Sequence, residues 1–218
     1  MNKLVIVIVS TLLLIGAFIV GLYVMKSTEE GATVGQAEQN AASLVRDHSP
    51  RAGNADARVT IVEFFDPACG TCRAFHPIVK DIMRSLPGRV NLVTRYMPLH
   101  PGAEDVVRIL EAARLQGKYW ETLEAGYQAQ PRWAINHQAH ANLFWQSVAS
   151  VGLDQDRVAA DMRSDAVTRN IQLDIEDGRR LGVDKTPGFF VNGKPLLQFG
   201  ERQLRELVMQ EVQREYGN

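Results

Sequence analysis

Strand-like apolar patterns are clearest in two short runs, Val59–Phe65 and Val90–Tyr96. Both runs are rich in β-branched and aromatic residues, and the first has no turn former inside it, which is typical of central strands covered on both faces. Between the two runs, apolar residues recur at helical spacing until Pro87-Gly88. The pattern predicts a strand–helix–strand unit, whose natural closure is a right-handed parallel crossover.

The pattern changes twice in the second half of the chain. From about residue 103 to 182 there is almost no strand-like run, and several helical patterns predict a block of helices. Two short apolar runs follow, Gly188–Val191 and residues 196–199, and an Asn-Gly pair between them is typical of a hairpin turn. A last helical pattern places Leu204 and Val212 on one face. The order βαβ, helices, ββα predicts an α/β domain with a mixed sheet and an inserted all-helical lobe.

The N-terminus carries a longer apolar run, residues 4–25, without a charged side chain. As a helix it would be about 33 Å long, which is enough for a hydrocarbon core of about 30 Å. We therefore expect residues 1–25 to form an N-terminal transmembrane helix. A cleaved signal peptide is the alternative, but its apolar region is normally about 7–15 residues long and ends at a small-residue cleavage site. Residues 26–50 hold few large apolar side chains and predict a tether, which leaves residues 51–218 as the folded domain.

Composition and charge narrow the classes of function. Hydrophobic residues make up 45% of the chain and charged residues 22%, as in ordinary globular proteins, which excludes wholesale disorder and coiled coil. Lys and Arg total 24 against 25 for Asp and Glu, so a net charge of −1 gives no electrostatic footprint for nucleic acid. We expect no nucleic-acid partner.

The only two cysteines form the sequence Cys69-Gly70-Thr71-Cys72, directly after the first predicted strand. A helix that begins near Cys69 would stabilise its thiolate, because unpaired N–H groups and a partial positive charge gather at a helix N-terminus. Cys72 would lie one turn further on and be better shielded, placed to attack a mixed disulfide and release the partner. Gly70 and Thr71 are small and leave the first sulfur accessible, so we expect them to face the substrate.

The two thiols could also bind a metal, form a structural disulfide or belong to a non-catalytic adaptor. A zinc site would need histidines, and the candidates are His76, His100, His137 and His140. A purely structural disulfide would constrain almost no unfolded chain. A non-catalytic adaptor would not depend on Cys69. Redox chemistry by a dithiol requires no cofactor and no metal.

Two segments of the sequence resemble a known family. They are Phe64-Phe-Asp-Pro-Ala-Cys-Gly-Thr-Cys-Arg-Ala-Phe-His-Pro77 and, far downstream, Lys185-Thr-Pro-Gly-Phe-Phe-Val-Asn-Gly193. Together they are similar to the thioredoxin superfamily, and specifically to its DsbA-like branch of extracytoplasmic thiol–disulfide oxidoreductases. The resemblance covers about residues 50–218, including the helical insertion. It implies a thioredoxin fold and protein clients with thiols or disulfides outside the cytoplasm. The apolar run at residues 4–25 is unlike soluble DsbA. Together the two features lead us to expect a single-pass protein of a bacterial inner membrane, with its catalytic domain on the periplasmic side and a membrane or periplasmic redox partner.

The resemblance also implies roles for individual residues. Pro187 is expected to be cis and to face the cysteines, and Thr186 is expected to present its backbone to an incoming peptide. Glu63, six residues before Cys69, matches a buried acid of the family. A carboxyl group inside an apolar strand has a raised pKa and can shuttle the proton of the buried Cys72 thiol. The alternative is that Glu63 simply faces solvent.

Two departures from the family leave the direction of electron flow open. The DsbA pattern has Pro-His between the two cysteines, whereas this chain has Gly70-Thr71 at the same place. Thr186 before Pro187 is closer to the pattern of disulfide isomerases and some reductases. Both differences point to a less oxidising dithiol. A reductase or isomerase that receives electrons from a membrane donor therefore remains an alternative, and a metal-binding module of thioredoxin fold is another.

Overall fold

The computed structural model describes residues 43–217 and, apart from them, Gly16. The expected membrane anchor and most of the expected tether therefore lie outside the described residues. Within the described part of the chain, no helix is both long and apolar enough to cross a membrane. All that follows concerns the compact unit formed by the described residues after position 42.

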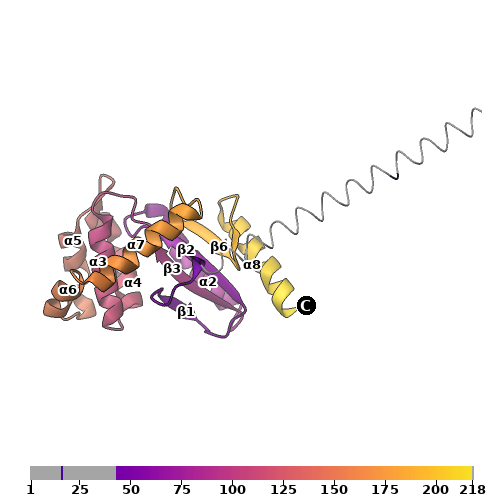
Figure 1. Cartoon of the computed structure of the whole chain (residues 1–218), viewed down its shortest axis with the longest axis horizontal. Coiled ribbons are helices and arrows are strands. Elements are labelled where there is room, and N and C mark those ends of the chain that lie inside the picture. The colour runs from indigo at the N-terminus through magenta and orange to yellow at the C-terminus, as the bar shows by residue number, and fades with distance from the viewer. Residues whose placement is uncertain (1–15, 17–42, 218) are drawn as a thin grey trace, which may run out of the picture. The chain divides into compact units, whose positions relative to one another are not determined.

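A five-stranded mixed sheet has the order β1-β3-β2-β6-β7 (Figure 1). The central pair, β2 (Val59–Phe65) and β3 (Val90–Tyr96), is parallel, as the strand–helix–strand pattern predicted. On the other side of β2, β6 (Gly188–Val191) runs antiparallel. The edge strands β1 (Arg51–Gly53) and β7 (Lys194–Pro195) are short. The predicted mixed sheet is confirmed.

Helices cover both faces of the sheet because alternate side chains of β2 point to opposite sides. Ile61 packs in one core with apolar side chains of α2 (Gly70–Ser85) and α8 (Glu201–Tyr216). Phe64 belongs to a second core on the other side, where α7 (Asp165–Arg180) contacts β3. The sheet is thus buried on both faces, which explains why its central strands are rich in β-branched and aromatic residues.

The helical insertion packs beside the sheet, with most of its helices grouped on the left in Figure 1, and its core also includes Phe65 and Tyr96 of the central strands and both cysteines. Trp133 and Phe144 are buried there and pack edge to face, with ring centroids 5.0 Å apart. Its elements are α3 (Ala103–Leu115), α4 (Tyr119–Trp133), β4 (Ala134–Ile135), β5 (Gln138–Ala139), α5 (Ala141–Ser147), the 3₁₀ turn Ala149–Val151, α6 (Gln155–Asp161) and α7. The prediction of an all-helical lobe is therefore wrong in one detail, because a two-residue turn closes a small hairpin between α4 and α5.

The hairpin after β6 differs from its prediction in the position of its second strand. The expected strand at residues 196–199 is replaced by β7 at Lys194–Pro195. Asn192 and Gly193 form a two-residue turn with φ of +46° and +84°, so pairing begins immediately after the turn. The chain then leaves the sheet, and Leu197 is 88% exposed.

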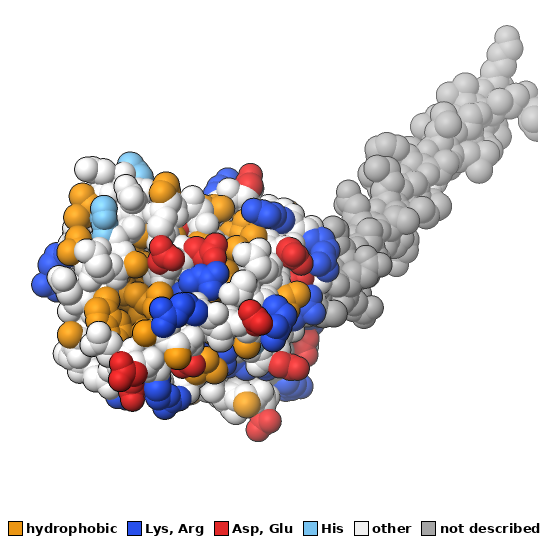
Figure 2. Space-filling model, turned by 60° about the vertical axis from the view of Figure 1, so that its left-hand side comes forward, with side chains coloured by type: hydrophobic (Ala, Val, Ile, Leu, Met, Phe, Trp, Pro, Cys, Tyr) orange, Lys and Arg blue, Asp and Glu red, His pale blue; other side chains and the backbone are white. Residues whose placement is uncertain are grey.

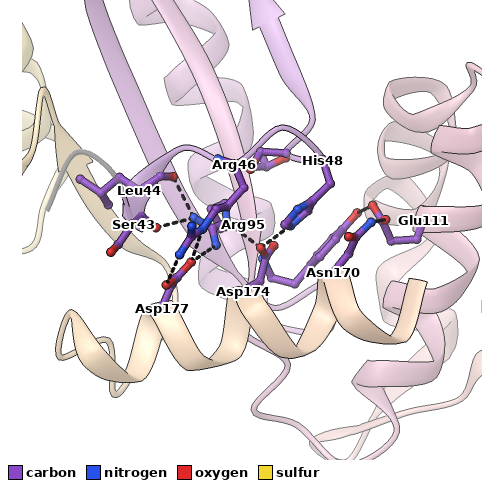
Figure 3. A network of polar contacts seen from close by, with 12 residues as sticks. Ser43, Leu44, Arg46, His48, Arg95, Glu111, Asn170, Asp174 and Asp177 are labelled. Atoms are coloured by element: carbon purple, nitrogen blue, oxygen red, sulfur yellow. Dashed lines mark hydrogen bonds and ion pairs between the residues drawn. The ribbon is translucent and has the colours of Figure 1, made fainter. Parts of the chain in front are cut away.

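The folded unit also begins before the boundary expected at residue 51. Leu44 is buried against the sheet, and the backbone N–H of Thr94 donates to the carbonyl oxygen of Pro50 (3.0 Å). Arg95 on β3 donates to the carbonyl oxygens of Ser43 and Leu44 at 2.6 and 3.0 Å (Figure 3). Residues 43–50 are therefore docked on the domain and are not part of a tether.

The surface shown in Figure 2 carries interspersed basic and acidic side chains with small apolar patches between them. A near-neutral chain with mixed charges offers no continuous basic stripe on this face.

Candidate active site

The first cysteine caps the N-terminus of α2. After β2 ends, Asp66 shapes the turn, because its carboxylate accepts the N–H of Ala68 (2.8 Å) and its carbonyl accepts the N–H of Cys69 (3.0 Å). Cys69 has extended backbone angles and its sulfur accepts the N–H of Cys72 at 3.4 Å, so the helix proper begins at Gly70. The predicted position of the dithiol at a helix N-terminus is confirmed.

The two sulfurs have opposite electrostatic surroundings. The pKa of Cys69 is lowered to about 5, first by a hydrogen bond from the Cys72 thiol. The backbone N–H groups of Cys72 and Thr71 and the side chain of Thr186 lower it further, although burial opposes the shift. The pKa of Cys72 is raised well above its usual value, mainly because this thiol is completely buried. Both cysteines are free in this structure. Near neutral pH the first sulfur is a thiolate and the second a thiol, which is the asymmetry that attacking and resolving roles require.

A cis peptide bond between Thr186 and Pro187 lies opposite the cysteines, as the resemblance implied. The Cys69 sulfur is 3.3 Å from the carbonyl oxygen of Thr186. The next residue, Gly188, starts β6, and a Cβ atom there would come within 2.8 Å of the Val183 side chain. A glycine at this position therefore allows the loop that carries Pro187 to pack closely against Val183.

Glu63 lies on β2 and is only 4% exposed, so the alternative that it faces solvent is wrong. Its pKa is raised to about 8, first because the carboxyl group is buried and second because Cys69 is negatively charged. Glu63 in turn helps to raise the pKa of Cys72. The carboxyl group is therefore neutral near pH 7. It lies close enough to the dithiol for the charge of Cys69 to raise its pKa, and for its own charge to raise the pKa of Cys72.

Gly70 and Thr71, the two residues between the cysteines, are both exposed. A Cβ atom at Gly70 would meet no heavy atom within 4 Å. The side of the helix N-terminus that carries them is open, as expected for residues that face a substrate.

Sequence reasoning missed Asp66 as a positioning residue. Its fully buried carboxylate accepts the backbone N–H groups of Leu99 (2.6 Å) and His100 (2.7 Å) and lies 2.8 Å from Nδ1 of His100. This carboxylate joins the loop after β3 to the turn before Cys69. The Asp-Pro pair just ahead of the cysteines is a recognised turn signal and could have indicated the role.

Gln130 on α4 was also missed. Its side-chain amide donates to the carbonyl oxygens of Pro67 (2.8 Å) and Cys69 (3.0 Å). The helical insertion thereby holds the backbone of the active-site turn. Its partners are 61 and 63 residues away in the sequence, and no local pattern around Gln130 signals the contact.

Of the histidines that could bind a metal, His76 lies apart from His100 and His137. His76 on α2 lies 3.4 Å from Glu124, whereas His100 contacts Asp66 and is stacked with His137 at a centroid distance of 6.4 Å. In the part of the chain that the structure describes, no three His, Cys, Asp or Glu side chains are grouped as metal ligands would be.

A βαβ unit followed by ββα, with a dithiol at the N-terminus of the first helix opposite a cis-proline, defines a thiol–disulfide oxidoreductase of the thioredoxin type. A family model described as thioredoxin matches residues 46–209, and the chain belongs to this family.

Among solved structures, a thioredoxin-like oxidoreductase from Silicibacter pomeroyi DSS-3 is 30% identical, covers 79% of this chain and 95% of its own, and has a TM-score of 0.67. The thiol-disulfide exchange protein α-DsbA2 from Wolbachia pipientis shares the fold at 21% identity and a TM-score of 0.68, over 84% of this chain and 97% of its own. Among curated proteins, a Na⁺/H⁺ antiporter NhaA from Herminiimonas arsenicoxydans is 31% identical over 144 residues, which is 66% of this chain. The chain spans about a quarter of the length of the curated relatives it matches.

Proposed function

We propose that this chain donates disulfide bonds to protein clients outside the cytoplasm through the pair Cys69 and Cys72. The observation that carries the proposal is the lowered pKa of Cys69, about 5, beside a buried thiol at Cys72. A thiolate that is stable at neutral pH stabilises the reduced form of the dithiol, which makes the disulfide form a better oxidant.

The proposed reaction begins when a client thiolate attacks the Cys69 sulfur of the Cys69–Cys72 disulfide. A bond forms between the client sulfur and Cys69, and Cys72 leaves as a thiolate. Glu63, whose pKa is about 8, supplies the proton that converts Cys72 to its buried thiol.

In the second step another client thiolate attacks the client sulfur of the mixed disulfide. The client disulfide forms, and Cys69 leaves as the stabilised thiolate. Two electrons have passed from the client to the dithiol, and a membrane or periplasmic redox partner must remove them to restore the disulfide.

Client binding is proposed to use the backbone beside the dithiol. Thr186, whose carbonyl oxygen lies 3.3 Å from the Cys69 sulfur, would pair with an extended client segment as an added strand, and Pro187 would hold this loop against the cysteines. Gly70 and Thr71 leave room on the open side of Cys69.

A single-pass anchor through residues 4–25, with the domain on the periplasmic side of a bacterial inner membrane, is part of the proposal. Its support is the uncharged apolar run in the sequence. An oxidising compartment suits a protein that donates disulfides.

The second candidate is a reductase or isomerase that receives electrons from a membrane donor. Gly70-Thr71 between the cysteines and Thr186 before Pro187 favour it, since both differ from the strongly oxidising DsbA pattern.

The reduction potential of the full chain, equilibrated against glutathione, separates the two candidates. We expect a value near the roughly −120 mV of strong oxidants, whereas a value near the roughly −180 mV of protein disulfide isomerase would support the isomerase of the second candidate. A value near the roughly −270 mV of thioredoxin would contradict the proposed direction and support the reductase. Failure to form any reversible disulfide would refute both.

A further inference from the structure

A cavity of about 450 Å³ opens next to the turn that carries Cys69, on the side of Gly70. Its walls come from three separate parts of the chain: the turn before α2 with the start of that helix, the loop after β3, and the end of α4 with the β4–β5 hairpin that follows it. Ala68 and Gly70, the two chain neighbours of Cys69, both line it. A client cysteine bound to Cys69 would therefore place an adjoining residue at this cavity.

The lining is rich in hydrogen-bond donors and free of acids. Arg73, His100 and His137 reach the cavity together with the amide of Asn136, and no Asp or Glu is among the described residues that line it. Arg73 is exposed and forms no ion pair with any residue in the described part of the chain. The carboxylate of Asp66, which contacts His100, is buried and already engaged by that imidazole and by backbone N–H groups. A guanidinium group can only donate, and its preferred partner is a carboxylate.

The hairpin is held in a conformation that brings an imidazole to the cavity. Asn136 and His137 both adopt left-handed backbone angles, with φ of +51° and +60°. Such a two-residue turn favours Asn-Gly, so histidine at its second position is unusual. The ring of His137 is stacked on that of His100 at an interplanar angle of 9°, and both rings border the same cavity.

From this geometry we infer that the cavity is a subsite for a carboxylate, carried by an acidic residue of the client next to its reactive cysteine. The inference rests on the proposed function, because it assigns part of the client to this site. Residues on one side of the client cysteine would pair with the backbone of Thr186. The acidic residue on the other side would pass over Gly70 to Arg73 and His137.

Matched cysteine peptides test the subsite. Each peptide cysteine is first joined to 4-thiopyridine in a mixed disulfide. In the measured step the Cys69 thiolate attacks the peptide sulfur, a disulfide forms between them, and 4-thiopyridone leaves with a proton as a neutral chromophore. One set of peptides carries Glu or Gln before the cysteine, and a second set carries Glu or Gln after it. Rates are measured with the reduced full chain at low and high salt.

We expect the Glu peptide of one set to react roughly tenfold faster than its Gln partner at low salt, with the ratio falling as salt screens the charges. The double variant Arg73→Gln/His137→Asn should bring the ratio close to one; asparagine is chosen because it tolerates a positive φ. Arg202→Gln, which removes an exposed arginine from α8, should leave the ratio unchanged.

Equal rates for Glu and Gln in both sets, or a preference that survives the double variant, would overturn the subsite while leaving the proposed function intact. If Cys69 reacts with dithiodipyridine but with none of the four peptides, the proposed function fails and the subsite with it. The 4-thiopyridyl disulfides of glutathione and of its diethyl ester form a further pair. The glutathione disulfide with free carboxyl groups could react faster than its ester, in a way that depends on Arg73 and His137, while the peptides show no preference. That result would mean that the cavity takes a small thiol and would refute a client subsite.

Discussion

Two sets of buried polar side chains lie on the adjacent strands β2 and β3 and behave in opposite ways. Glu63 on β2 lies among the groups of the dithiol site, and burial together with the negative charge of Cys69 raises its pKa to about 8. Arg95 on β3 is equally buried, but it lies between two carboxylates of α7 (Figure 3).

The arginine set is fully paired. Arg95 lies 2.7 Å from Asp174 and 2.7 Å from Asp177, and Arg46 and His48 of the docked N-terminal segment complete the network at 2.8 and 2.7 Å. Burial acts to raise the pKa of Asp177, but hydrogen bonds from Arg46 and Arg95 hold it below its usual value. Asp177 therefore keeps its negative charge near neutral pH, and the network ties β3, α7 and residues 43–50 together.

The contrast shows how one sheet can use buried charge for two purposes. A carboxylate with a cation beside it keeps its charge and serves the structure. A buried carboxyl group whose pKa is set by burial and a neighbouring thiolate titrates near neutral pH, so it can exchange a proton with its surroundings. The predictions below test this contrast.

The largest loss of stability is expected for Arg95→Met. The substitution keeps much of the side-chain volume but leaves Asp174 and Asp177 buried without their central cation, which should lower the free energy of unfolding by about 3–5 kcal/mol. Urea denaturation measures it. Arg180→Gln is the matched control, because Arg180 lies 3.3 Å from Asp177 but is 61% exposed, and it should change stability by less than about 1 kcal/mol. Equal effects of the two substitutions would contradict the assignment.

Glu63→Gln should act in the opposite direction and stabilise the protein. In the unfolded chain Glu63 loses its proton near pH 4.5, whereas in the folded chain it keeps the proton up to about pH 8, so ionisation disfavours folding increasingly across this range. Glutamine cannot ionise, and its advantage should grow from near zero below pH 4.5 to roughly 2–4 kcal/mol above pH 8. Unfolding of the reduced protein at several pH values measures the difference. A difference that does not depend on pH would show that folding leaves the pKa of Glu63 unchanged and would contradict its burial as a neutral acid.

A smaller effect is expected where only neutral hydrogen bonds are lost. Gln130→Leu removes the amide that donates to the carbonyl oxygens of Pro67 and Cys69, which should destabilise the protein by about 1–3 kcal/mol. Gln128→Leu is the control, since Gln128 lies on the same helix but is exposed. If both variants unfold at the same urea concentration, Gln130 does not hold the active-site turn.

The sequence predicted the parts of the fold that depend on local pattern. The bounds of β2 and β3 follow from runs rich in β-branched and aromatic residues, and the position of the dithiol follows from the strand that precedes it. The short edge strands β1 and β7 were missed or misplaced, because two or three residues carry no periodic pattern.

Long-range pairing explains the remaining errors. Residues 43–50 looked like a tether because their few apolar side chains gave no sign of docking. Their partners on α7 are more than a hundred positions away, as the pair Arg46 and Asp177 shows with a separation of 131. Glu63 and Cys72 could be placed in the site by their distance from Cys69, whereas Gln130 reaches it only through the fold of the insertion.

The central claim is that the two cysteines differ in charge at neutral pH. Its most direct test is alkylation of the reduced full chain by iodoacetamide as a function of pH, with the modified cysteine identified by mass spectrometry. We predict modification of Cys69 with an apparent pKa of about 5, while Cys72 stays unmodified in the folded protein. An apparent pKa near the ordinary value of 9.0 for Cys69, or modification of Cys72 first, would contradict the account.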